Sequence, residues 1–179
     1  RHIRAVADQY ADAGYLAIAP AVFDRVERDV DVPYTDIPRG FGYMQQMSND
    51  LVMLDLRAAV ERVATAGKVG VVGYCWGGTM AYLAAARLPI AAAVSYYGGG
   101  TAQHLAEKPR CPLMFHYGEK DTHIPLSQVE AVKAANPSGI FHLYEAEHGF
   151  NCTDRSSYEP ASAKLALERS LDFFRLHVG

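Results

Sequence analysis

The chain has 179 residues, the length of one ordinary domain. Half of the residues are hydrophobic, 21% are charged and the formal net charge is -3, a composition that excludes intrinsic disorder and gives no reason to expect a nucleic acid as partner. No apolar run approaches the roughly 20 residues that span a bilayer, so no membrane is expected as partner either. Three cysteines are too few for a disulfide framework and leave at least one free, which predicts a reducing, cytoplasmic setting.

Hydrophobic periodicity and turn residues divide the chain into alternating helices and strands. It opens on an amphipathic helical pattern that ends at Gly14, without an initiator Met or a signal segment, so we expect an N-terminally incomplete fold. A polar stretch at residues 24–45, with two prolines and two glycines, predicts a long irregular segment. The other elements are expected, in chain order, as a strand at 15–19, a helix at 48–65, a strand at 68–73, a helix at 77–87, strands at 91–97 and 112–117, a helix at 127–135, a strand at 140–144 and a helix at 160–176.

The predicted strands are continuous apolar runs of five to seven residues, which is typical of strands buried on both faces. Alternating with helices, they predict a doubly wound α/β fold with a mostly parallel sheet, in a single domain over residues 1–179. The run at residues 15–19 would present an apolar strand edge, which we expect to be covered by a second chain or by strands of a preceding segment. The oligomeric state stays open, with a homo-oligomer as one alternative.

The sharpest motif is GYCWGG at residues 73–78, between a predicted strand and a predicted helix. A nucleophile flanked by glycines two residues away is typical of a nucleophile elbow, a tight turn that strains the nucleophile's backbone. We expect Gly73 and Gly77 to be required because a Cβ at either position would collide with a neighbouring element. The turn also places Cys75 at a helix N-terminus, which favours a thiolate. A buried structural cysteine is the alternative, whereas a phosphate-binding loop is excluded by the glycine spacing.

Two later loops offer a base and an acid to orient it. Asp121 follows the strand at 112–117, and His148 follows the strand at 140–144. The order Cys, Asp, His is the order of the α/β-hydrolase fold, and all three residues come just after strand ends, where open parallel sheets build their sites. The sequence therefore predicts that Cys75, His148 and Asp121 form a catalytic triad.

Other chemically active side chains have no comparable motif context. We expect Glu119 to be a weaker alternative acid, and Glu145 and Glu147, which flank His148, to be solvated. His116 and His142 lie inside predicted strands and are expected in the core, whereas His123 has a small chance of lining the site. The glycine run 98–100 (Gly98, Gly99 and Gly100) is expected to be a plain turn, and Cys111 and Cys152 to be structural. No pattern of metal ligands is present, so we expect no metal and no cofactor.

These residues resemble the dienelactone hydrolase family (carboxymethylenebutenolidases) within the α/β hydrolases. The resemblance implies Cys75 as nucleophile, His148 as base and Asp121 as the acid that orients it. It rests on an opening R-x-x-A-D-x-Y-A-x-x-G-Y-x-A-x-A-P at 4–20, GYCWGG at 73–78, GEKDTHIP at 118–125, EHGFN at 147–151 and a closing S-Y-x-x-x-S-A-x-x-A-x-x-R-S-L-x-F-F at 157–174.

The chain also departs from the family pattern. The family's early strands, which carry one oxyanion donor and a glutamate that activates the cysteine, would precede Arg1. The family's substrate-binding arginine, four residues after the histidine, is Cys152 here, with Arg155 nearby. An upstream arginine with a tyrosine four residues later is matched in spacing by Arg39 and Tyr43, which we predict bind the substrate.

The sequence thus predicts a cysteine-dependent hydrolase that acts on a lactone or a small carboxylic ester. The expected route is a thioester acyl-enzyme on Cys75, with the backbone N–H of Trp76 as one oxyanion donor. Three alternatives stay open: a general esterase or thioesterase, a non-catalytic relative that keeps the fold for binding, and a redox-sensing thiol.

Overall fold

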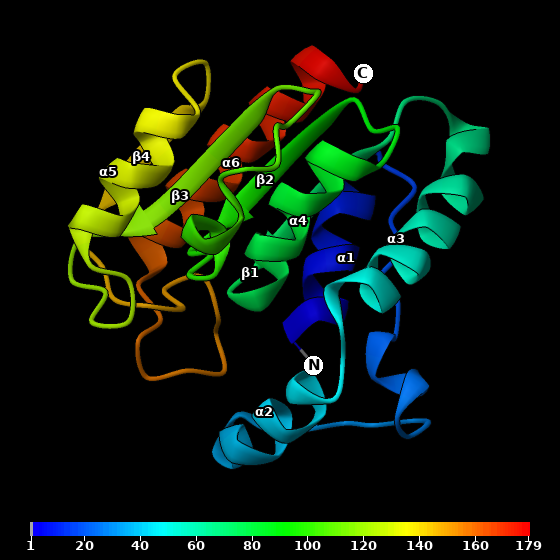
Figure 1. Cartoon of the computed structure of the whole chain (residues 1–179), viewed down its shortest axis with the longest axis horizontal. Helices are drawn as coiled ribbons and strands as arrows, with labels where there is room; N and C mark the ends of the chain where they lie inside the picture. The colour runs from blue at the N-terminus through cyan, green and yellow to red at the C-terminus, as the bar shows by residue number, and fades with distance from the viewer. Residues whose placement is uncertain (1) are drawn as a thin grey trace. The chain divides into compact units, whose positions relative to one another are not determined.

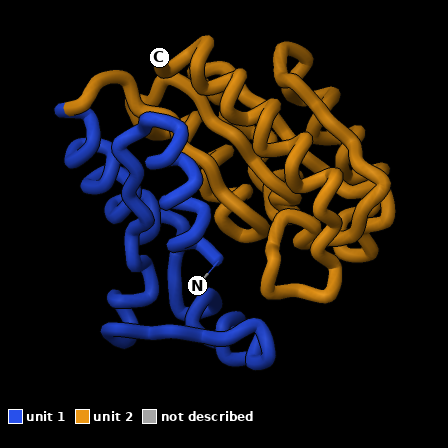
Figure 2. The backbone as a smooth tube through the Cα atoms, turned by 180° about the vertical axis from the view of Figure 1, so that it is seen from behind, with its two compact units in different colours: residues 1–65 blue, residues 66–179 orange. Residues whose placement is uncertain are grey.

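The computed structural model describes residues 2–179 (Figure 1); Arg1, where the predicted opening helix begins, lies outside the described residues. The chain divides into two compact units, Arg1–Thr65 and Ala66–Gly179, which Figure 2 colours separately. The organisation as a single domain over residues 1–179 stays a prediction. Among the described residues, no helix is both long and apolar enough to cross a lipid bilayer.

The second unit is built on a parallel sheet of four strands in the order β1-β2-β3-β4. Each predicted strand and helix of this unit is present within two residues of its expected bounds, so the α/β prediction is confirmed. The elements are β1 (Gly70–Tyr74), α4 (Trp76–Arg87), β2 (Ala92–Tyr96), the 3-10 turn η4 (Thr101–His104), β3 (Leu113–Gly118), α5 (Leu126–Ala135), β4 (Ile140–Tyr144) and α6 (Pro160–His177) (Figure 1).

Helices cover both faces of this sheet, as a doubly wound fold requires. Ser95 and Tyr96 are adjacent in β2, so their side chains point to opposite faces. A Cβ built on Gly78 of α4 would lie 2.9 Å from the Ser95 hydroxyl. The Tyr96 hydroxyl, in contrast, is 2.8 Å from that of Ser170 on α6. Consequently α4 and α6 lie on opposite sides of β2.

The two inner strands, β2 and β3, are buried along their whole length. His116 lies in this core as predicted, with its Nδ1 2.8 Å from the Tyr144 hydroxyl and its Nε2 3.0 Å from the Ser170 hydroxyl. Burial, with the charges of His142 and Arg169, holds the pKa of His116 well below its usual value. The low pKa favours the neutral form of this histidine, whose two ring nitrogens link β3 to β4 and to α6.

The first unit contains α1 (His2–Asp12), the 3-10 turns η1 (Val22–Arg25) and η2 (Tyr34–Asp36), α2 (Ile37–Gln45) and α3 (Asn49–Val63), followed by η3 (Ala64–Ala66) at the junction of the two units. Two of the predicted helices are confirmed. The opening helix ends before Gly14, and α3 begins after Ser48, whose side chain accepts a hydrogen bond from the Leu51 N–H at 3.2 Å.

Two expectations for the first unit are wrong. Residues 15–19 do not form a strand, because no described strand pairs with them; Leu16 is 62% exposed and Ile18 47% exposed. Residues 24–45 are not irregular throughout, because residues 37–45 form α2. The Asp36 carboxylate accepts a hydrogen bond from the Arg39 N–H, and Pro38 lies in the first turn, where its missing N–H costs nothing. Proline in this stretch therefore marks a helix start.

Candidate active site

A strained turn carries the candidate nucleophile from β1 into α4. Cys75 has φ 55° and ψ -118°, a conformation that L residues rarely adopt. Its N–H donates to the Tyr96 carbonyl at 3.0 Å, and its own carbonyl accepts from the Gly78 N–H at 2.9 Å. These bonds hold the turn to β2 on one side and to the first turn of α4 on the other, which is the geometry of a nucleophile elbow.

The glycines around this turn act differently from the expectation. A Cβ on Gly73 would lie 1.8 Å from the Gly77 carbonyl oxygen, and a Cβ on Gly78 would lie 2.6 Å from the Tyr96 carbonyl oxygen. A Cβ on Gly77 would meet nothing within 4 Å. The prediction that Gly77 is sterically required is therefore wrong, because that position faces open space; the second close approach is at Gly78.

The structure brings Cys75, His148 and Asp121 into one line of contacts. The His148 Nε2 is 3.1 Å from the Cys75 sulfur, and its Nδ1 is 2.7 Å from Asp121 Oδ2. The other carboxylate oxygen accepts the backbone N–H groups of His123 at 2.8 Å and Ile124 at 3.1 Å. With both of its oxygens engaged, the buried carboxylate of Asp121 is fixed against the imidazole.

The competing acids lie elsewhere. Glu119 and Glu147 are exposed, and Glu145 pairs with Lys120 at 2.8 Å on the surface. None of these three glutamates replaces Asp121 at the His148 ring, where Nδ1 lies 2.7 Å from Asp121 Oδ2. The local reason is the turn after β3, in which the two backbone N–H groups draw the Asp121 side chain inward.

The three side chains shift one another's protonation. Burial lowers the pKa of His148, but hydrogen bonds to Asp121 and Cys75 outweigh it and raise this pKa to about 9. Burial raises the pKa of Cys75, but the hydrogen bond and charge of His148, the Trp76 backbone N–H and the charge of Arg155 together lower it. The Asp121 pKa is lowered in the same way, against its burial, chiefly by His148. These opposite directions favour a thiolate–imidazolium pair at neutral pH.

The other two thiols lie in different surroundings. Burial raises the pKa of Cys111 to about 11. Cys152 is 2% exposed in the loop that follows His148. Among residues 2–179, the thiol that is hydrogen-bonded to an imidazole is that of Cys75.

The residues predicted to bind substrate carboxylate form a cluster of their own in the first unit. Arg39 Nη2 donates to the Tyr43 hydroxyl at 3.2 Å, and that hydroxyl donates to the Glu27 carboxylate. Arg39 also lies 3.8 Å from Glu27, so the guanidinium is shared between two partners. Their role in substrate binding stays a prediction, as does that of Trp76 as an oxyanion donor.

Four residues around His148 were not assigned, or only weakly assigned, from the sequence. Ser157 donates to the His148 carbonyl at 2.7 Å. The Arg155 side chain lies against Gly149, where a Cβ would be 2.8 Å from its Nη1. The rings of Tyr97 and His123 lie 5.0 and 5.2 Å from the His148 ring, which puts His123 in the wall of the site. No local pattern identifies these residues, because each is brought near the His148 loop by the tertiary fold rather than by a motif.

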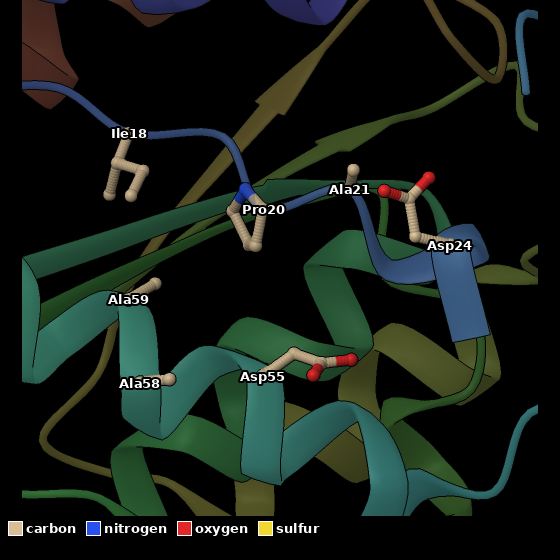
Figure 3. A pocket seen from close by; sticks show the side chains of 7 residues that line it. All are labelled: Ile18, Pro20, Ala21, Asp24, Asp55, Ala58 and Ala59. Carbon is tan, nitrogen blue, oxygen red and sulfur yellow. The ribbon is translucent and has the colours of Figure 1, made fainter. Parts of the chain in front are cut away.

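A separate groove of about 330 Å³ lies within the first unit (Figure 3). It runs between the extended segment that contains Ile18 and Pro20 and the α3 helix, where Asp55 pairs with Arg25 at 2.7 Å. Its lining includes no thiol and no imidazole, so it offers no nucleophile of the elbow type. Within residues 2–179, no set of three or more His, Cys, Asp or Glu side chains is arranged to hold a metal ion.

Known proteins are similar to this chain in sequence and in fold. A sequence model of the dienelactone hydrolase family matches residues 1–178. The carboxymethylenebutenolidase of Pseudomonas putida is 35% identical over 175 residues, which cover 90% of this chain and 74% of the relative. A solved structure of a Klebsiella pneumoniae protein assigned as a dienelactone hydrolase has 31% identity and a TM-score of 0.84, over 97% of this chain and 80% of that one. A dienelactone hydrolase-like promiscuous phosphotriesterase from metagenomic libraries, 18% identical with a TM-score of 0.76 over 99% of this chain and 81% of that one, shares the fold.

Proposed function

Because the chain belongs to the dienelactone hydrolase family, we propose that it hydrolyses lactones or small carboxylic esters through Cys75, His148 and Asp121. The single observation that carries the proposal is the line of contacts from the Cys75 sulfur through the His148 ring to the Asp121 carboxylate, at 3.1 and 2.7 Å. The position of Cys75 on a strained elbow at the start of α4 supports its role as the nucleophile.

The first half of the reaction uses the protonated His148. The Cys75 thiolate attacks the substrate carbonyl carbon, and the carbonyl oxygen takes the electron pair as an oxyanion that the Trp76 N–H stabilises. When this intermediate collapses, the carbon–oxygen bond of the ester breaks and His148 gives its proton to the leaving oxygen. The product of this half is a thioester between Cys75 and the acyl group.

The second half uses the neutral His148 as a base. Its Nε2 takes a proton from a water molecule, whose oxygen attacks the thioester carbonyl. The second intermediate expels the Cys75 thiolate, the carboxylic acid leaves, and the thiolate–imidazolium pair is restored. Asp121 keeps the ring in one orientation and stabilises its positive charge throughout.

The proposal includes the setting and the substrate. A nucleophilic thiol must stay reduced, which fits a cytoplasmic location. Arg39 and Tyr43 are proposed to bind a carboxylate on the substrate, since arginine pairs well with carboxylates. Assembly into a homo-oligomer stays a prediction.

The direct test is hydrolysis of a dienelactone and of p-nitrophenyl acetate, measured side by side with the complete protein. We expect turnover of at least one, and its loss after treatment with iodoacetamide. Turnover of the acetate alone would point to a general esterase. Absence of turnover with both, in a folded protein, would contradict the proposed activity.

The pH dependence of thiol alkylation gives a prediction that needs no substrate. Because the hydrogen bond and charge of His148 lower the pKa of Cys75 against its burial, its alkylation by iodoacetamide should be half-maximal at a lower pH than for an ordinary thiol. Peptide mass spectrometry after timed alkylation measures this for each cysteine. Cys111 is the internal control, because its pKa of about 11 keeps it protonated over the same range. A Cys75 midpoint at or above that of a free thiol would show that the ion pair does not form.

A further inference from the structure

Tyr97 has a strained backbone at the end of β2. Its φ of 38° places it in the left-handed region, which is unfavourable for a residue with a Cβ. The Tyr97 N–H donates to the His116 carbonyl at 2.7 Å, so the strained residue is held to β3. The next residue is equally confined, because a Cβ on Gly98 would lie 2.7 Å from the Ser95 hydroxyl. Strain that the surrounding structure enforces in this way is often associated with a functional site.

The strained backbone directs the Tyr97 ring toward the candidate base. Tyr97 is only 2% exposed, and the centroid of its ring is 5.0 Å from that of the His148 ring. On another side the ring packs edge-on against Phe150 at 5.4 Å, and Phe150 is completely buried. The ring therefore has little freedom to move, and it forms a rigid surface beside the imidazole.

The proposed reaction creates a need for such a surface. In the free protein the His148 ring is held at both nitrogens, by Asp121 and by Cys75. Once the sulfur of Cys75 carries an acyl group, it no longer offers a negative charge to Nε2, and only Asp121 and the ring contacts hold the imidazole. The ring must nevertheless stay aligned while it takes a proton from water, since small misplacements of a base are costly in rate.

We propose that Tyr97 is a positioning residue, whose ring keeps the His148 imidazole in line between Asp121 and Cys75, above all in the acyl-enzyme. This inference rests on the proposed function of the triad. The aromatic ring also lies within the distance at which a π-system stabilises a neighbouring cation, which favours the protonated imidazole in the resting pair.

The test compares Tyr97→Leu, Tyr97→Phe and Phe115→Leu in the complete protein. Tyr97→Leu removes the ring from His148, and we expect kcat and KM to fall together by about tenfold, because slower deacylation lets the acyl-enzyme accumulate and leaves kcat/KM nearly unchanged. The alkylation midpoint of Cys75 should shift to higher pH, because the imidazolium is less well held. Tyr97→Phe keeps the ring and should restore kcat to within about threefold of the wild type, with an unchanged midpoint.

Phe115→Leu is the matched control, because Phe115 is a fully buried aromatic residue of β3 whose ring stacks on that of Phe141 at 4.4 Å rather than on His148. It should lower Tm without changing the alkylation midpoint or kcat. If Tyr97→Leu does not fold, Tyr97→Met fills the space with a flexible apolar chain and is measured instead. In the wild type, proton NMR should show cross-peaks between the rings of Tyr97 and His148, and their absence would overturn the proposal whatever the variants do.

Two further outcomes would overturn it: wild-type kcat and midpoint in a folded Tyr97→Leu or Tyr97→Met, or equal changes in that variant and in Phe115→Leu. The alkylation arm also separates this inference from the proposed function. If the wild type hydrolyses neither ester, the proposed function fails, and the midpoints of the variants still decide whether Tyr97 positions His148.

Discussion

Replacing Cys75 by Ala is expected to lower the rate of ester or lactone hydrolysis by about 10³-fold or more, because the covalent nucleophile is lost. The Cys75 sulfur alone among the three thiols has the His148 Nε2 within 3.1 Å. His148 and Asp121, the other two members of the line of contacts, carry no sulfur and cannot form a thioester. The measurement is kcat/KM for p-nitrophenyl acetate and a dienelactone, with circular dichroism to show that the variant is folded.

Cys111→Ala and Cys152→Ala are the matched controls for this loss. Burial raises the pKa of Cys111 to about 11, so this thiol stays protonated, and Cys152 is only 2% exposed, which keeps a substrate away from its sulfur. Both variants should retain hydrolysis within a few fold of the wild type, after correction for any unfolded fraction. Full activity in Cys75→Ala would end the proposed mechanism, even if both controls behave as expected.

Replacing Gly73 by Ala is expected to destabilise the fold by about 3 kcal/mol or more, which is the upper range for overpacking a close-packed site. The added Cβ would lie 1.8 Å from the Gly77 carbonyl oxygen and 2.2 Å from its carbonyl carbon. These are backbone atoms of the turn itself, so the strain is relieved only by opening the elbow. Urea unfolding followed by circular dichroism measures the loss, and activity should fall with it.

Gly77→Ala tests the same elbow at a position that the structure leaves open. Apart from its chain neighbours and the backbone of α4 itself, no heavy atom lies within 4 Å of a Cβ built there, and the residue is in the first turn of α4. We expect the free energy of unfolding to change by less than about 1 kcal/mol, in the stabilising direction that alanine's helix propensity favours. Equal losses of stability in both alanine variants would contradict the asymmetry of the turn.

The amino-acid sequence determined the parts of this protein that depend on local pattern and chain order. Apolar runs bounded by turn residues were sufficient to place all four strands of the parallel sheet. The elbow motif at 73–78 and the two loops after later strands were sufficient to bring Cys75, Asp121 and His148 to one edge, because consecutive parallel strands end at the same edge. The apolar run at 15–19 shows the limit of this reasoning, since an extended segment becomes a strand only when another strand pairs with it.

Only the tertiary structure decided the features that depend on contacts between residues far apart in the sequence. Whether Gly77 or Gly78 must lack a side chain depends on which of them faces β2. The protonation of Cys75 depends on its burial and on the ring of His148 and the charge of Arg155, which both come from the segment between β4 and α6. The contact of Tyr97 with His148 joins the ends of β2 and β4, which are separated by about fifty residues of chain. Such effects are set by distances in space between residues far apart in sequence, and no periodicity or motif encodes those distances.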